Sequence, residues 1–144
     1  MTDEKVESSF VMADTNVIVN LTKSSPLSQQ YEALRNGRLI AISFQVRAEL
    51  AGYPDTQGWG GARQQRLAEL VAACVQVPQT DASITWYARV AQRRKELRLQ
   101  QVSDGDVWVI AQALEHSAPL MTHDRAAGQL AQTMGVKVLT TLEL

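Results

Sequence analysis

Short runs of hydrophobic residues alternate along this chain with longer segments in which apolar residues recur at helical spacing. Each short run holds a few apolar residues and ends at a polar or turn-forming residue, which is typical of a buried strand. The predicted strands are residues 10–13, 39–42, 75–77, 119–121 and 136–139. The predicted helices fill the intervals, at residues 17–23, 27–36, 44–51, 62–73, 81–99, 103–116 and 125–134. This alternation predicts an α/β fold with a central parallel sheet of roughly four to five strands and helices on both faces.

The sequence also predicts a loop, a flexible leader and the extent of the folded domain. The stretch from Gly52 to Gly61 is rich in glycine and contains Pro54, so the sequence predicts a loop there. Residues 1–9 are polar and acidic, and we expect them to form a flexible leader before the first strand. Residues 10–144 have a length typical of a single domain, and no internal repeat divides them.

The composition excludes several classes of protein. The chain has 144 residues with 14 basic and 15 acidic side chains and a formal net charge of −1, so its bulk charge does not attract nucleic acid. RNA or DNA would have to bind through a local patch or through metal ions. Cys74 is the single cysteine, which excludes an intramolecular disulfide and a cysteine-built zinc site. No apolar run is long enough to span a membrane and the N-terminus does not resemble a secretory signal, so we expect a cytoplasmic protein with no membrane partner.

Acidic residues stand where predicted strands end or where the following helices begin. Asp14 follows the first strand, Asp124 follows a later one, and Asp106 lies at a helix start that Ser103 can cap. Glu49 lies within the helix after the second strand. Taken singly, each acid could be a helix cap or a solvated helix residue. In a parallel sheet, however, the carboxyl ends of the strands meet at the edge where α/β proteins bind ligands, so we expect these side chains to converge.

Carboxylates that crowd into one pocket repel one another, and the repulsion favours their protonated forms. A hard divalent cation relieves that repulsion, and carboxylate oxygens are the ligands that Mg²⁺ and Mn²⁺ prefer. Mg²⁺ keeps several waters, so one of them can be activated as a nucleophile, and a second ion could stabilise the leaving oxygen of a phosphodiester. The pattern therefore indicates metal-assisted hydrolysis.

The residues around these acids resemble those of a known family. In their order and at their intervals, four segments are similar to the acidic motifs of PIN domains, and within that superfamily they most resemble VapC-type toxins of bacterial toxin–antitoxin pairs. The resemblance extends over nearly the whole chain, from about Phe10 to Leu139. The four segments are Met12–Asn16, Arg47–Leu50, Asp106–Leu114 and Met121–Asp124.

The resemblance implies a PIN-like three-layer α/β/α sandwich and a metal-dependent endoribonuclease, the toxin of a type II toxin–antitoxin system. It also implies a cognate VapB-like antitoxin, whose tail covers the acidic pocket, and a homodimer. The substrate would be RNA, and the cofactor would be Mg²⁺ or Mn²⁺. The implied catalytic and metal-binding acids are Asp14, Glu49, Asp106 and Asp124.

Hydroxyl and amide side chains would support these acids. Thr15 or Asn16 would assist near the first strand, and the hydroxyl of Thr122 could orient a carboxylate or a water on the metal. Asp104 is an extra acid that could replace Asp106 as the third metal ligand. We prefer Asp106, because it aligns with the acid that precedes the Trp-containing helix in the family.

Other interpretations stay open at this point. The main alternative is a non-catalytic PIN-like module that binds RNA or protein. A phosphatase of the haloacid dehalogenase type would need an aspartate where Asn16 stands. The basic residues within 81–99 could contact RNA phosphates or form a solvated helix face. Trp59 could stack on an unpaired base or pack locally, and His123 could touch a substrate or be a bystander.

Overall fold

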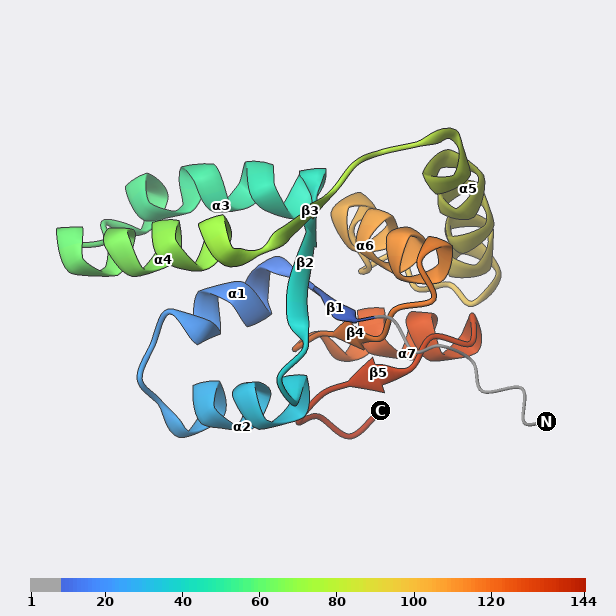
Figure 1. Ribbon diagram of the computed structural model, residues 1–144. Coiled ribbons are helices and arrows are strands. Elements are labelled where there is room, and N and C mark those ends of the chain that lie inside the picture. Colours follow the sequence, from blue (N-terminus) through green and yellow to red (C-terminus); the bar gives the residue numbers. More distant parts are fainter. Residues whose placement is uncertain (1–8) are drawn as a thin grey trace.

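One parallel sheet of five strands runs through the centre of the structure, a computed structural model that describes residues 9–144 (Figure 1). The strands follow the order β3-β2-β1-β4-β5, and every neighbouring pair is parallel. Each strand coincides with a predicted one, so the predicted parallel sheet is confirmed. Of the predicted leader, residues 1–9, only Ser9 lies within the described residues. The strands are β1 (Phe10–Ala13), β2 (Leu39–Ser43), β3 (Val75–Val77), β4 (Leu120–Met121) and β5 (Val138–Leu139).

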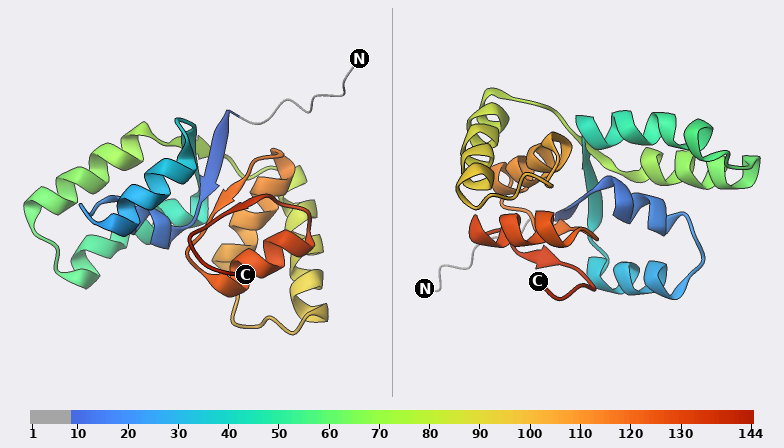
Figure 2. Two further views of the ribbon diagram at one scale, coloured as in Figure 1. Left: turned by 90° about the horizontal axis from the view of Figure 1, so that it is seen from below. Right: turned by 180° about the vertical axis from the view of Figure 1, so that it is seen from behind.

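Helices cover both faces of the sheet, which confirms the α/β/α sandwich (Figures 1 and 2). The helices α1 to α4 belong to the connections from β1 to β2 and from β2 to β3, whereas α5 to α7 belong to the return connection to β4 and the step to β5. Since crossovers between parallel strands are right-handed, the two sets lie on opposite faces. The helices are α1 (Thr15–Leu21), α2 (Pro26–Arg35), α3 (Phe44–Gln57), α4 (Gly61–Ala73), α5 (Asp81–Glu96), α6 (Asp104–Glu115) and α7 (Arg125–Thr133).

The strand β1 and the helix α6 form the middle of the hydrophobic core. The last three residues of β1 are fully buried, because this strand has neighbours on both sides and helices on both faces. Val107 and Ile110 of α6 are also fully buried, where α6 packs against β1, β2 and β4, and α5 covers its outer side. No helix within residues 9–144 has both the length and the apolar character that a membrane span requires.

The strand order reverses between β1 and β4. The chain steps from β1 outward to β2 and β3, returns to β4 on the other side of β1, and then continues outward to β5. The loops at the carboxyl ends of β1 and β4 therefore lead to opposite faces, and the point between these two strand ends, the switch point, is the usual ligand-binding place in such sheets. Asp14 directly follows β1, and Asp124 lies three residues after Met121, the last residue of β4.

The predicted loop from Gly52 to Gly61 is wrong over most of its length. The helix α3 continues through Pro54 to Gln57, and only residues 58–60 connect it to α4. Gly58 ends α3 in the left-handed conformation with φ of 65°, which glycine adopts without strain. The ring of Tyr53 packs edge-on against Trp59, with 5.4 Å between ring centroids. Tertiary packing of this kind outweighs the local cost of a proline inside a helix.

Candidate active site

Asp14 lies at the switch point, where β1 ends and α1 begins. Its side chain is the N-cap of α1, because Oδ1 accepts a hydrogen bond of 2.9 Å from the amide of Val17. Its other oxygen accepts a hydrogen bond from the hydroxyl of Thr122, which follows β4. The residue is only 4% exposed, so this carboxylate is held in place on both oxygens inside the protein.

Glu49 reaches the same place from α3. The hydroxyl of Thr15, at the start of α1, donates a hydrogen bond to Oε2 of Glu49. Its other oxygen lies beside the first turn of α6, because a Cβ built on Gly105 would be 2.9 Å from Oε1. Glu49 is exposed, yet its carboxylate is placed between the N-termini of α1 and α6. The predicted support from Thr15 therefore takes the form of a direct hydrogen bond.

Asp106 and Asp124 lie at the starts of α6 and α7. Asp106 lies in the first turn of α6, where its amide donates a hydrogen bond of 3.1 Å to the hydroxyl of Ser103. Asp124 is the N-cap of α7, and its Oδ1 accepts a hydrogen bond of 2.9 Å from the amide of Ala127. Both residues are partly buried. The structure thus places each acid at or near the N-terminus of a helix.

The charges of neighbouring acids act on two of these carboxylates. Burial, together with the charge of Asp106, raises the pKa of Asp14 from 3.8 to about 6, although the hydrogen bonds from Thr122 and Val17 act to lower it. Burial also raises the pKa of Asp106, and the charges of Asp124 and Glu49 add to that shift. Asp106 therefore lies near enough to the other three acids to interact with their charges.

Asp104 faces away from this group. Its Oδ1 lies 2.9 Å from the guanidinium of Arg94 on α5, and its side chain is 74% exposed. Asp104 and Asp106 are two residues apart on α6, so their side chains leave the helix on nearly opposite sides. Asp106 is the one on the side of Glu49 and Asp124.

The donor set fits a hard divalent cation. All four side chains offer carboxylate oxygens, and no ion pair joins any of them to Lys or Arg within residues 9–144. In that same part of the chain no three acidic, His or Cys side chains already converge on one point as direct ligands. Mg²⁺ commonly takes one or two carboxylates directly and reaches others through its waters, so a set with this wider spacing suits it.

Comparison with known proteins identifies the fold family. The family model of the PIN domain matches residues 11–133. The chain belongs to the PIN domain family. The predicted resemblance to PIN domains is thereby confirmed. No curated protein sequence matches this chain significantly.

Solved toxin–antitoxin structures contain chains similar to this PIN domain. VapBC-5 from Mycobacterium tuberculosis, a member of the VapBC family, matches with 26% identity and a TM-score of 0.71, over 93% of this chain and 100% of that chain. VapBC2 from Rickettsia felis, bound to a fragment of its promoter DNA, matches with 18% identity and a TM-score of 0.73, over 91% and 98%. VapBC-1 from nontypeable Haemophilus influenzae has 22% identity and a TM-score of 0.68, over 90% and 96%. The last two likenesses show the fold.

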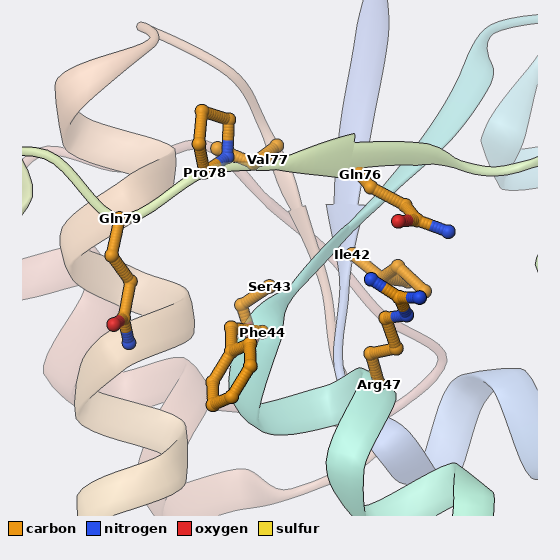
Figure 3. A pocket seen from close by; sticks show the side chains of 8 residues that line it. All are labelled: Ile42, Ser43, Phe44, Arg47, Gln76, Val77, Pro78 and Gln79. Atoms are coloured by element: carbon orange, nitrogen blue, oxygen red, sulfur yellow. The ribbon is translucent and has the colours of Figure 1, made fainter.

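A second concave feature of this PIN domain lies at the carboxyl ends of β2 and β3 (Figure 3). It is a hollow of about 240 Å³ that contains one cation, Arg47, and no carboxylate. Arg47 and Glu49 are two residues apart on α3, so the hollow and the acidic site lie on different sides of that helix. The residues that line the hollow are Ile42, Ser43, Phe44, Arg47, Gln76, Val77, Pro78 and Gln79.

The basic residues of α5 and the loop tryptophan take part in contacts within the protein. Arg94 pairs with Asp104, and Arg93 lies 3.6 Å from Glu96 and donates to the carbonyl of Thr133. These contacts favour the interpretation of α5 as a structural helix face. The Trp59 ring is covered by the guanidinium of Arg63 at 3.7 Å and by Tyr53, which favours local packing over stacking on a base.

Gly105 and Tyr31 are two residues near the acids that the sequence did not single out. The signal for Gly105 was its place between Asp104 and Asp106 in the first turn of a helix, where glycine is a poor helix former. Its missing side chain leaves the space that Oε1 of Glu49 occupies. No sequence signal pointed to Tyr31, which lies far from the acids along the chain.

Gly105→Ala is expected to reduce activity at this site by about tenfold without loss of stability. The new methyl group would displace the Glu49 carboxylate from its place beside the first turn of α6, whereas alanine is about 1 kcal/mol better than glycine within a helix. Thermal unfolding and an RNA cleavage assay measure the two effects. Gly52→Ala on α3 is the matched control, because a Cβ there meets nothing within 4 Å. Equal activities of the two variants would contradict the placement of Glu49.

Proposed function

We propose that this PIN domain is a metal-dependent endoribonuclease. The observation that supports the proposal lies at the point where the strand order reverses: the charges of Glu49 and Asp124 raise the pKa of Asp106, and the charge of Asp106 raises the pKa of Asp14. This repulsion disfavours the charged forms of Asp14 and Asp106 and so destabilises the metal-free protein, which a bound cation would offset. A fold that served only as a scaffold would have no use for such an arrangement.

The residues of the acidic site would have different roles in the reaction. Asp14, Glu49, Asp106 and Asp124 would hold Mg²⁺ or Mn²⁺, with Thr122 and Thr15 keeping the carboxylates of Asp14 and Glu49 in orientation. When bound, the ion would supply a Lewis acid and a water activated for attack on a phosphodiester. We leave Asp104 out of the ligand set, because it pairs with Arg94.

We further propose that the protein is the toxin of a type II toxin–antitoxin pair. The similar solved chains come from VapBC complexes, which supports a VapB-like antitoxin as a partner. The antitoxin would inhibit the enzyme by covering the four acids, and the toxin would act as a homodimer on RNA in the cytoplasm. If a short DNA-binding protein is encoded beside this gene, its expression should reverse growth arrest caused by the toxin. Growth that continues on expression of the toxin alone would contradict this role.

The experiment that tests the nuclease proposal uses the purified full chain. We expect RNA oligonucleotides to be cleaved with Mn²⁺ or Mg²⁺ present and to stay intact with EDTA, and we expect the same ions to raise the melting temperature. Mass spectrometry of the products would locate the internal cuts of an endonuclease. Stabilisation by Mn²⁺ without cleavage of any RNA would favour the alternative, a PIN-like module that binds RNA or protein without catalysis.

A further inference from the structure

Tyr31 connects α2 to the strand end that carries Thr122 and Asp124. The residue is fully buried, and its hydroxyl oxygen lies 3.0 Å from the carbonyl oxygen of Thr122 and 2.7 Å from Nδ1 of His123. The tyrosine ring packs edge-on against the imidazole, with 5.6 Å between centroids and 85° between planes. A single phenol thus holds two successive residues of the segment that follows β4.

The directions of these hydrogen bonds follow from the number of protons available. A tyrosine hydroxyl has one proton, and a backbone carbonyl can only accept. The carbonyl of Thr122 belongs to a fully buried residue, and leaving it unpaired would be costly. Tyr31 therefore donates to Thr122, and Nδ1–H of His123 donates to Tyr31. The neutral imidazole of His123 then carries its proton on Nδ1.

The contact extends to the acids through Thr122. While Tyr31 holds the carbonyl of Thr122, the hydroxyl of Thr122 donates to Asp14 and accepts a hydrogen bond of 3.1 Å from the amide of Asp124. Thr122 therefore contacts both Asp14 and Asp124 and is itself held by Tyr31. Displacement of Thr122 would change the separation between the carboxylates of Asp14 and Asp124.

We propose that Tyr31 is a positioning residue of the acidic site, whose hydroxyl fixes the Thr122–Asp124 segment so that the carboxylates of Asp14 and Asp124 bind one cation together. This inference rests on the proposed metal-dependent function and deepens it. Tyr31 itself is buried behind the segment and touches neither ion nor RNA. Residues that orient metal ligands in this indirect way typically change metal affinity or activity about 10- to 100-fold when they are removed.

The test is Tyr31→Phe, which removes the hydroxyl and keeps the buried ring. We expect the Kd for Mn²⁺, measured by calorimetry without RNA, to rise about tenfold or more. In cleavage assays kcat at a fixed Mn²⁺ concentration should fall, while KM for RNA stays unchanged. Tyr53→Phe is the matched control, because the Tyr53 hydroxyl makes no hydrogen bond within residues 9–144. An unchanged Kd for Mn²⁺ in Tyr31→Phe would overturn the proposal, even if the variant were less stable.

A second measurement does not depend on the folding of that variant. The chain has 2 histidines, so His116→Gln leaves His123 as the single imidazole for nitrogen NMR. We expect the proton of the uncharged ring form on Nδ1; a proton on Nε2 would mean that Tyr31 donates to His123, and would overturn the proposal. The Mn²⁺ titration also separates this inference from the nuclease function. If the wild type binds Mn²⁺ tightly, the Tyr31→Phe result stands whether or not RNA is cleaved; if it binds none, both proposals fail.

Discussion

Asp14→Asn is expected to reduce Mn²⁺-dependent RNA cleavage by about 10³-fold and to stabilise the metal-free protein. The loss follows because the most deeply buried carboxylate of the site would no longer neutralise the cation, at a cost of roughly 4 kcal/mol in the transition state. The gain follows because burial of the charge is unfavourable, as the raised pKa of Asp14 shows. Asparagine can still accept the hydrogen bond from Val17 and cap α1. Single-turnover cleavage and thermal unfolding in EDTA measure the two effects.

Asp104→Asn is the matched control for this experiment. It makes the same chemical change two residues from Asp106, in an exposed ion pair with Arg94. We expect cleavage to stay within about twofold of the wild type and stability to change by less than about 1 kcal/mol. Loss of activity in Asp104→Asn together with normal activity in Asp14→Asn would contradict the proposed ligand set.

The metal-free protein is expected to become more stable as the pH falls from about 7.5 toward about 5. The pKa of Asp14 is about 6 in the folded protein against an ordinary value of 3.8, so the folded state binds the proton more tightly than the unfolded state. The penalty for burying the charge is fully present above the folded pKa and disappears as the pH falls toward 3.8. A shift of this size corresponds to about 3 kcal/mol. The raised pKa of Asp106 acts in the same direction.

Urea unfolding in EDTA at several pH values measures this dependence. The informative quantity is the difference in the free energy of unfolding between Asp14→Asn and the wild type, because other titrating groups cancel in it. That difference should favour the variant at pH 7.5 and shrink toward zero as the pH falls to about 4. A difference that is the same across this range would show that Asp14 is not buried as a charge.

Much of the fold follows from local pattern. The strands could be predicted because each is a short apolar run bounded by polar residues, and the parallel arrangement followed from their alternation with helices. The continuation of α3 through Pro54 could not be predicted from the sequence, because proline and glycine favour a loop by local propensity. In the structure the Tyr53 ring packs against Trp59, just beyond the end of α3, and this contact accompanies the longer helix (Figure 1).

The positions of the acids also depend partly on local sequence and partly on tertiary structure. Asp14 and Asp124 each cap a helix through a bond to the amide three residues later, a local interaction that the sequence alone determines. Helical spacing also places Asp104 and Asp106 on opposite sides of α6. Which of the two faces Glu49 and Asp124 was decided only when Val107 and Ile110 packed against the sheet and fixed the rotation of the helix.

The sequence by itself determined the class of fold, the order of its elements and the acids at the helix starts, because these depend on residues within a few positions of one another. Tertiary structure alone brought Tyr31 against Thr122, and Thr15 and Gly105 against Glu49. Those contacts join segments that are far apart along the chain, and their geometry exists only once the strands have paired and the helices have packed on both faces.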